Sequence, residues 1–252
     1  MSGLIASVLL LLLCAVGHAA DARKSGFDLM QPATQALQKD DAQNPAMLWV
    51  KDGQARWLKP DGAAAKSCAH CHGEITGMRG VAARWPMYSS AQNKVLNLSQ
   101  QINLCRTEQQ RATPWSPEHD ALLGLEAAIA KKSRDLPIKP PAQAQLAEAQ
   151  NRGEILFNQR IGQVDLSCRD CHEKLAGKRL GGNTIPQGHA TGYPIYRLEW
   201  QSVGSLQRRL RGCITAVRAE PYAYGATELV DLEAYLAKRA AGMQIESPGV
   251  RP

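Results

Sequence analysis

The chain contains 252 residues, of which 44% are hydrophobic and 21% charged, and its formal net charge is +7. This positive charge lies wholly outside the uncharged residues 1–20 and favours anionic ligands or an acidic partner. A nucleic-acid partner is disfavoured, because the sequence contains no known nucleic-acid-reading motif and begins with a segment typical of export.

Residues 1–20 predict a cleaved secretory signal, with an apolar stretch at 4–16 followed by small residues. A membrane anchor is the alternative, but it needs nearer to about 20 apolar residues and a charged stop. A lipid anchor at Cys14 is disfavoured because the bulky Leu13 precedes it. We therefore expect a periplasmic protein without a membrane anchor, from which Cys14 is lost.

About 230 residues remain, enough for one large or two small domains. The proline-containing stretch at 133–143 is typical of a linker. We place the boundary there, which predicts an N-terminal domain at 21–137 and a C-terminal domain at 138–252.

The first half contains the motif "SCAHCH", which places Cys68, Cys71 and His72 together. Helical spacing of apolar residues then predicts two amphipathic helices. The first, at 94–110, carries Cys105, and the second, at 116–133, has Ser116 and Pro117 in its cap and first turn.

The second half repeats this arrangement. A predicted helix at 142–160 precedes "SCRDCH", which holds Cys168, Cys171 and His172. The Gly/Pro-rich segment 175–196 reads as a long loop, and no strand-rich region is predicted. A solitary cysteine, Cys213, follows the loop, and a helix at 227–242 ends at a glycine.

A duplicated C-x-x-C-H motif has a specific chemical meaning. Two cysteines three positions apart share one face of a helical turn and can form thioethers to the two vinyl groups of a haem, while the histidine binds its iron. A structural zinc site would leave the histidines unexplained, and a redox pair or a short-loop disulfide is also disfavoured. The motifs thus predict two covalently bound haem c groups, held by Cys68, Cys71, Cys168 and Cys171, with iron ligands His72 and His172.

The fold expected from these observations is all-α, with two class I cytochrome c-like haem domains in tandem, long loops and little sheet. The helices at 142–160 and 227–242 are similar to the terminal helices of such a domain.

The second axial ligand of each iron is less directly indicated. Methionine is the usual choice, and the sequence offers Met78 and Met87 in the first half, with Met243 and His189 in the second. Instead, we favour the two solitary cysteines, Cys105 and Cys213, because each occupies an equivalent place in its repeat. A disulfide between these two cysteines is the alternative that their even number permits.

If 204–213 is helical, Arg209 lies one turn before Cys213 on the same face. A guanidinium there could hold an oxyanion beside the sulfur, since its planar fork matches two oxygens better than an ammonium does. Arg208, Arg211 and Arg218 are as readily explained by a solvated basic face or by haem propionates.

Taken together, several segments resemble the SoxA family, the dihaem cytochrome subunits of the SoxAX complex of thiosulfate oxidation. They are "NPAMLWV" (44–50), "SCAHCHG" (67–73), "NLSQQINLCR" (97–106), the stretch 182–213 and "VRAEPY" (217–222).

The resemblance implies an L-cysteine S-thiosulfotransferase that couples thiosulfate to a cysteine of the carrier SoxYZ. In the family, the cysteine matching Cys213 ligates the catalytic haem and is found as a persulfide. The arginine matching Arg209 binds substrate, and the cysteine matching Cys105 ligates the other haem. Two electrons pass to the monohaem partner SoxX and then to a small soluble cytochrome c.

Two other functions stay open from the sequence. A thiosulfate dehydrogenase would join two thiosulfates into tetrathionate, and a plain dihaem electron-transfer cytochrome would not act on thiosulfate at all.

Overall fold

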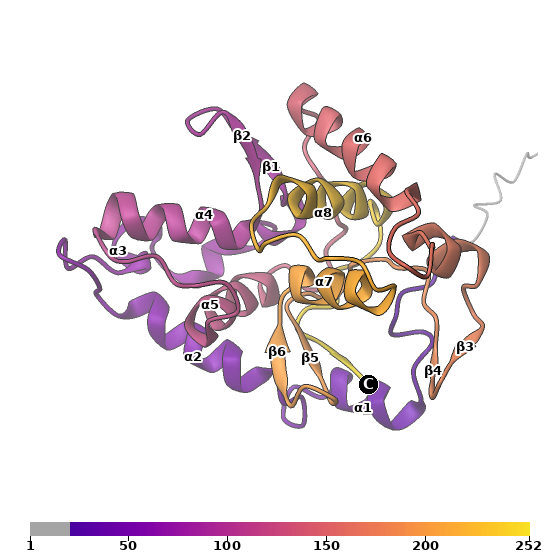
Figure 1. The fold of residues 1–252 in the computed structure, drawn as a ribbon. Helices are drawn as coiled ribbons and strands as arrows, with labels where there is room; N and C mark the ends of the chain where they lie inside the picture. The colour runs from indigo at the N-terminus through magenta and orange to yellow at the C-terminus, as the bar shows by residue number, and fades with distance from the viewer. Residues whose placement is uncertain (1–20) are drawn as a thin grey trace, which may run out of the picture.

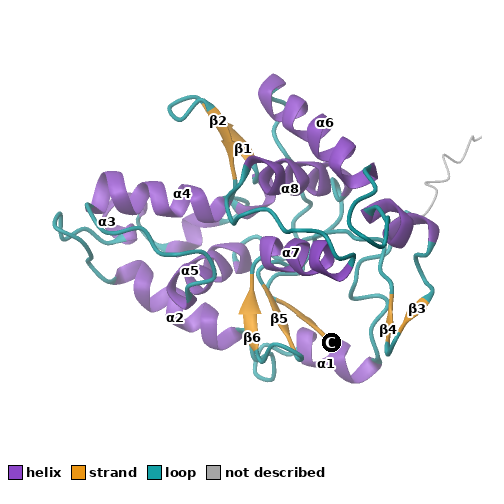
Figure 2. Ribbon diagram, viewed as in Figure 1, coloured by secondary structure: helices purple, strands orange, loops and turns teal. Residues whose placement is uncertain are grey.

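Residues 21–252 are described here by a computed structural model, and the predicted signal at 1–20 lies outside the described residues. Helices dominate, and short strands form small sheets between them (Figure 2). The helices are α1 (Pro32–Lys39), α2 (Met47–Leu58), α3 (Cys68–His72), α4 (Leu98–Cys105), α5 (Asp120–Lys131), α6 (Ala144–Asn158), α7 (Leu206–Ala216) and α8 (Thr227–Arg239). The strands are β1 (Met87–Ser89), β2 (Lys94–Leu96), β3 (Arg179–Leu180), β4 (Asn183–Thr184), β5 (Ile195–Arg197), β6 (Ser202–Gly204) and β7 (Gly249–Arg251).

Two helix pairs organise the chain: α2 packs on α5, and α6 packs on α8. Each pair approaches closely at a glycine. A Cβ added at Gly53 would lie 2.0 Å from the carbonyl oxygen of Gly124, and one added at Gly153 would lie 2.0 Å from that of Asp231. Neither approach leaves room for a side chain, so both halves use the same close helix contact.

We expect Gly153→Ala to destabilise the protein by about 3 kcal/mol, because its methyl group would push α6 away from α8. Gly182→Ala is the matched control, since a Cβ there meets no atom within 4 Å. Urea unfolding of both variants measures the difference. Equal midpoints would contradict the close contact.

Each helix pair covers a hydrophobic core, and the first cysteine of one motif packs against that core. Trp57, Leu122 and Leu125 belong to the first core, and the half-buried Cys68 packs against it. The second core contains Phe157 and Leu229, among others, and Cys168 packs against it in the same way. The apolar residues therefore place both motifs at the edge of a packed core.

The predicted helices at 142–160 and 227–242 are confirmed as α6 and α8, although α8 ends at Arg239. The helix predicted at 94–110 is wrong at its start. Lys94–Leu96 instead pairs with β1 as an antiparallel hairpin, and the Asn97 side chain accepts a hydrogen bond from the backbone N–H of Gln100, 2.9 Å away, to begin α4.

The helix predicted at 116–133 also begins later, at Asp120. Glu118 has a positive φ of 62°, which interrupts the helix. The cap is therefore His119, whose Nδ1 accepts from the backbone N–H of Ala121 at 3.1 Å.

The loop predicted at 175–196 contains more strand than expected. It includes the β3–β4 hairpin and the start of β5, which pairs antiparallel with β6 and parallel with β7. The β3–β4 and β5–β6 pairings are local hairpins, whereas β5 and β7 are distant in the sequence, so local patterns do not reveal their pairing. The C-terminus consequently lies beside α1 (Figure 1), where the backbone N–H of Val250 donates to Gln38 Oε1 at 2.9 Å.

None of the helices within residues 21–252 has both the length and the apolar character that crossing a membrane requires.

Candidate functional site

Helix α7 carries both Arg209 and Cys213. Its first turn is capped by Ser205, whose Oγ accepts from the backbone N–H of Arg208 at 3.1 Å. The apolar residues Leu206, Leu210 and Ile214 pack against the second core and fix the rotation of the helix. The helical geometry predicted for Arg209 and Cys213 is thus confirmed, and both residues line one cavity of about 240 Å³.

The second C-x-x-C-H motif reaches the same cavity through Cys168 and His172. Its turn is held by Asp170, whose carboxylate accepts from Ser167 Oγ at 2.8 Å and from Lys174 Nζ at 2.7 Å. Burial raises the pKa of the Cys171 thiol, and the nearby Cys213 raises it further. The predicted second-half residues therefore converge.

The His172 ring is held in a fixed orientation. Its Nδ1 lies 2.8 Å from the carbonyl oxygen of Pro186, so Nδ1 carries the proton and donates it. Gly188, with a φ of 75°, packs against the ring, and a Cβ there would lie 3.1 Å from His172 Cγ. In the neutral ring Nε2 keeps its lone pair, as an iron ligand requires, whereas a proton on Nε2 would be donated to Cys213.

The environment of Cys213 favours its thiolate. Burial raises the pKa of this thiol, whereas the His172 side chain lowers it. The positive charges of Arg209 and Arg197 lower it further, and the resulting pKa lies below the ordinary value. Cys168 contrasts with it, because burial and the nearby Cys213 raise the pKa of the Cys168 thiol to about 11.

Four arginines line this cavity: Arg179, Arg197, Arg209 and Arg251. Arg179 is exposed and donates to the Gly182 carbonyl oxygen at 3.2 Å. Arg197 donates to the Pro252 carbonyl oxygen at 2.8 Å, and Arg251 forms an ion pair with Glu246 at 2.6 Å. Within residues 21–252 the Arg209 guanidinium makes no hydrogen bond or ion pair. Arg209 is therefore the cation of this cavity that is free to bind an anion.

The other arginines of α7 are engaged elsewhere. Arg208 stacks on the Trp200 ring, 4.2 Å from its centroid, and donates to Ser202 Oγ at 3.2 Å. Arg211 stacks on Tyr224, 4.5 Å from that centroid, and hydrogen-bonds to the carbonyl oxygen of Tyr222. Aromatic contacts thus account for these two residues better than a solvated face does. Arg218 follows α7 with a positive φ of 59°.

The first motif is assembled less completely. Cys105, at the end of α4, lies near Cys68, and burial followed by this neighbour raises the pKa of the Cys68 thiol to about 11. Cys71 and His72 are exposed, and the His72 ring lies 5.9 Å from the Trp57 ring. The structure brings Cys68 and Cys105 together but does not orient His72 as it orients His172.

The alternative ligands of each half are placed differently. In the first half, Met78 packs against the same core as Cys68, and Met87 lies on β1. In the second half, Met243 packs with Ile138 and Ile245 and does not line the cavity. His189 does line it; its buried Nδ1 has no hydrogen-bond partner among the described residues. Burial, then the charges of Arg239 and Arg23, lowers the pKa of His189 to about 4. A neutral His189 ring could donate a hydrogen bond from Nδ1 to a carboxylate of a group bound in this cavity.

The disulfide alternative is wrong in this structure. Cys105 lies near Cys68 of the first motif and Cys213 near Cys168 of the second, and the six described cysteines are all free thiols.

Sequence reasoning missed several residues of the second site. Pro186, Gly188 and Tyr193 belong to the predicted long loop, and Arg197 and Arg251 lie on strands. The glycines and prolines of 175–196 were the available signal, because they mark a chain that must pass close to other groups.

Comparisons with known proteins agree on one family. A model described as "SoxA/TsdA, cytochrome c domain" matches residues 52–138 and 152–245. The chain is 36% identical over 232 residues to the L-cysteine S-thiosulfotransferase subunit SoxA of Rhodovulum sulfidophilum, covering 92% of this chain and 81% of that one. The subunit of the same name from Pseudaminobacter salicylatoxidans is 34% identical over 237 residues, covering 93% and 83%.

Among solved structures, the crystal structure of SoxXA from P. pantotrophus is similar, with a TM-score of 0.88 and 30% identity. The match covers 91% of this chain and 87% of that one.

Proposed function

This chain belongs to the SoxA/TsdA cytochrome c family, and on that premise we propose that it couples thiosulfate oxidatively to a cysteine of a sulfur-carrier protein. Relatives that cover most of its length carry the name L-cysteine S-thiosulfotransferase. The observation that supports this function best is one cavity that holds Cys213 and the unengaged Arg209 beside Cys168 and His172.

Members of a cytochrome c family bind haem c covalently. We propose two such groups, attached at Cys68 and Cys71 and at Cys168 and Cys171, one in each of two tandem domains (21–137 and 138–252). The second site supports this, because the fixed His172 ring, the Cys213 sulfur and the unpartnered His189 Nδ1 suit a haem and its carboxylates. When bound, the haem supplies an iron that accepts electrons one at a time.

We also propose the residues that would bind the two irons, from the C-x-x-C-H motifs and the solitary cysteines that follow them. His172 and Cys213 would bind the second iron, and His72 and Cys105 the first.

The chemistry of the coupling can be assigned to the chain's own residues. Arg209 binds the sulfonate oxygens of thiosulfate and offsets one of its two negative charges. The Cys213 thiolate forms a bond to the outer sulfur of thiosulfate, and two electrons leave. The carrier thiol then attacks that sulfur, the bond to Cys213 breaks, and one proton is released. The product is a carrier S-thiosulfonate.

The two electrons need an acceptor. By similarity to the SoxXA structure, we propose a heterodimer with the monohaem subunit SoxX, which would pass electrons to a soluble cytochrome c. Because 1–20 is typical of a signal, we place this reaction in the periplasm.

An assay of product with and without the carrier tests this function. We expect thiosulfate consumption and cytochrome reduction only when the carrier protein is present, with a matching mass increase on its cysteine. Tetrathionate formed without carrier would favour a thiosulfate dehydrogenase, and no thiosulfate-dependent reduction in either case would favour a plain electron carrier.

A further inference from the structure

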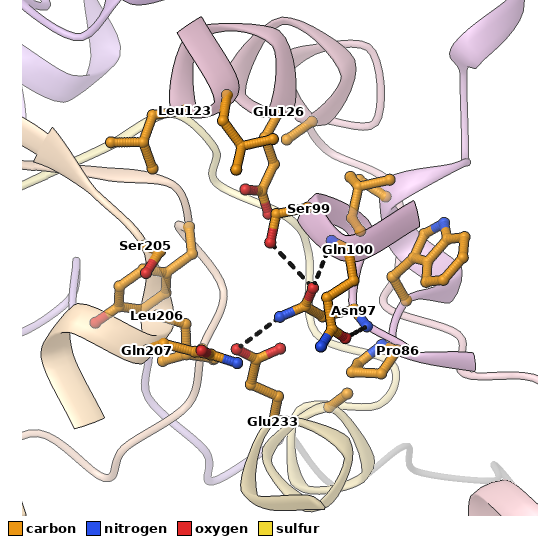
Figure 3. Close-up of a pocket in the computed structure, with 18 of the residues that line it drawn as sticks. Pro86, Asn97, Ser99, Gln100, Leu123, Glu126, Ser205, Leu206, Gln207 and Glu233 are labelled. Carbon is orange, nitrogen blue, oxygen red and sulfur yellow. Dashed lines mark hydrogen bonds between the residues drawn. The ribbon is translucent and has the colours of Figure 1, made fainter. Parts of the chain in front are cut away.

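A second cavity, of about 180 Å³, lies between the two halves of the chain, among α4, α5, α7 and α8. Figure 3 shows Glu126 extending into it from α5 and Glu233 extending into it from α8, with Asn97, Ser99 and Gln207 around them. This cavity takes no part in the proposed coupling.

The two glutamates occupy equivalent positions of the internal repeat. Glu126 lies in "LEAAIAK" (125–131) and Glu233 in "LEAYLAK" (232–238). In each helix the flanking residues belong to the core of its own half, as Leu125 and Leu232 do. An apolar residue is the ordinary choice at such a position, because burying a carboxylate costs free energy unless hydrogen bonds or an opposite charge compensate for the lost water. Both halves nevertheless place a carboxyl group here, facing the shared cavity.

The polar groups around the carboxyls leave some hydrogen-bonding capacity unused. Asn97 Nδ2 donates to Glu233 Oε1 at 3.3 Å, and Ser99 Oγ donates to Asn97 Oδ1 at 3.0 Å. Gln207 is only 4% exposed, and its amide lies near enough to Glu233 to affect that carboxyl, but its Nε2 makes no hydrogen bond of ordinary length to any described residue. Glu126 Oε2 is likewise buried without a partner in that part of the chain. A volume of 180 Å³ is large enough for several water molecules, which occupy roughly 30 Å³ each in the liquid.

No positive side chain offsets the two carboxyls. The described residues that line the cavity include no Lys, Arg or His, and its other titratable groups are Glu118, Tyr193 and Tyr224. Glu118 faces Glu126 from the turn before α5 and adds repulsion. Protons are therefore the simplest counter-charge available inside the cavity.

The pKa values of the pair agree with this arrangement. Burial, followed by repulsion from Glu233 and Glu118, raises the pKa of Glu126 to about 8. Burial raises the pKa of Glu233 to about 7, although the amides of Asn97 and Gln207 lower it in part. Both groups thus exchange protons near neutral pH.

The cavity adjoins both cysteine-bearing helices at their first turns. Asn97 caps α4, which ends at Cys105, and Gln207 lies in the first turn of α7, which carries Cys213. At 1.5 Å per residue, these helices separate the cavity from the two cysteines by about 12 Å and about 9 Å along their axes. An electron added near either cysteine would raise the pKa of a carboxyl at that range through like-charge repulsion in a low-dielectric interior.

We propose that Glu126 and Glu233 form one proton-binding site shared by the two halves, and that its occupancy rises when either haem is reduced. In the balanced step, each electron that a bound haem would take up from the coupling reaction is accompanied by up to one proton, which a carboxylate of the pair takes from the solvent. By linkage, protonation of the pair makes reduction easier by the same free energy. This inference rests on the proposal that both halves bind haem.

Potentiometric titration of the holoprotein in complex with its monohaem partner, from about pH 6 to 9, tests the proposal. We expect the reduction potential of at least one haem of this chain to fall as the pH rises through this range. Glu126→Gln and Glu233→Gln should each flatten the slope, and the double variant should remove most of it. Glu148→Gln, an exposed glutamate of α6, is the matched control and should keep the wild-type slope.

A slope that persists unchanged in the double variant overturns the proposal, because haem propionates or axial ligands would then be its source. Wild-type potentials that do not vary with pH overturn it as well. A change in the slope on exchanging Na⁺ for K⁺ or Ca²⁺, lost in the double variant, would show an inorganic cation site instead.

Stability provides a readout independent of the haem potentials. Because both folded-state pKa values lie above the ordinary 4.5, the folded protein binds more protons than the unfolded chain between that value and about pH 8. Unfolding by urea should therefore become easier as the pH rises from about 5 to 8, and the double glutamine variant should lose this dependence. Equal pH dependence in the two proteins contradicts the buried pair.

Failure of the proposed function is distinguishable in the same samples. Haem content by mass spectrometry and thiosulfate coupling are measured on each preparation. A missing first haem contradicts the two-haem proposal, and the pH dependence of the remaining potential still decides this inference. Loss of coupling with an intact pH-dependent potential contradicts the enzymatic function alone.

Discussion

Cys213→Met is expected to lower carrier-dependent thiosulfate oxidation by roughly a thousandfold or more, while haem c remains attached at Cys168 and Cys171. A thioether can bind iron, but it cannot form the covalent bond to thiosulfate sulfur that the proposed reaction requires. The measurement is steady-state cytochrome reduction with thiosulfate and carrier, together with intact mass to verify the haem.

The control for this variant is Gly212→Ala, which alters the neighbouring position of α7. A Cβ there meets no atom within 4 Å, so the helix should be unchanged and the activity retained. Substantial coupling by Cys213→Met would show that the sulfur of Cys213 does not carry the substrate.

Arg209→Ala should lower kcat/KM for thiosulfate by about 100- to 1,000-fold, as expected for removal of a charged group that stabilises a developing anion. The guanidinium lies in the cavity beside Cys213 and has no other partner among the described residues, so its charge is available to the substrate. Arg209→Lys should restore part of the loss, because an ammonium keeps the charge but not the planar fork.

Arg211→Ala removes the same charge from the same helix and serves as the control. Arg211 stacks on Tyr224 and does not line the cavity, so a small change in kcat/KM is expected. Equal losses in Arg209→Ala and Arg211→Ala would indicate a general effect of net charge rather than a binding role for Arg209.

The elements with strong helical periodicity were predictable from the sequence. Apolar residues at helical spacing placed α6 and α8 within a few residues of their observed limits. The helix at 94–110 was predicted too long because Lys94–Leu96 pairs across a hairpin with β1, and that pairing outweighs the local pattern. The parallel pairing of β5 with β7 could not be inferred, since these two strands are more than fifty residues apart in the sequence.

The candidate site was predictable where its chemistry is encoded locally. The spacing of Cys168, Cys171 and His172 is fixed by the motif, and the i, i+4 relation of Arg209 and Cys213 follows from one helix. The rest depends on tertiary structure. Tyr193 reaches the cavity through a loop, and Arg251 reaches it through a terminal strand.

The shared cavity was missed for a similar reason. The repeated "LEA" of the two helices is visible in the sequence, but only the packing of the two halves brings Glu126 and Glu233 to one cavity. Without that packing, each glutamate reads as an exposed residue on an amphipathic helix.

Low-temperature electron paramagnetic resonance of the oxidised holoprotein tests the central claim most directly, because low-spin haem signals distinguish thiolate from thioether ligation. We expect a histidine/thiolate signal from the second haem that disappears in Cys213→Met and is unaffected by Gly212→Ala. The proposed Cys105 ligation of the first haem should leave one thiolate signal in Cys213→Met. A histidine/methionine signal from the second haem of the wild-type protein, or a Cys213→Met spectrum that keeps every thiolate signal of the wild type, would contradict the assignment of Cys213 to that iron.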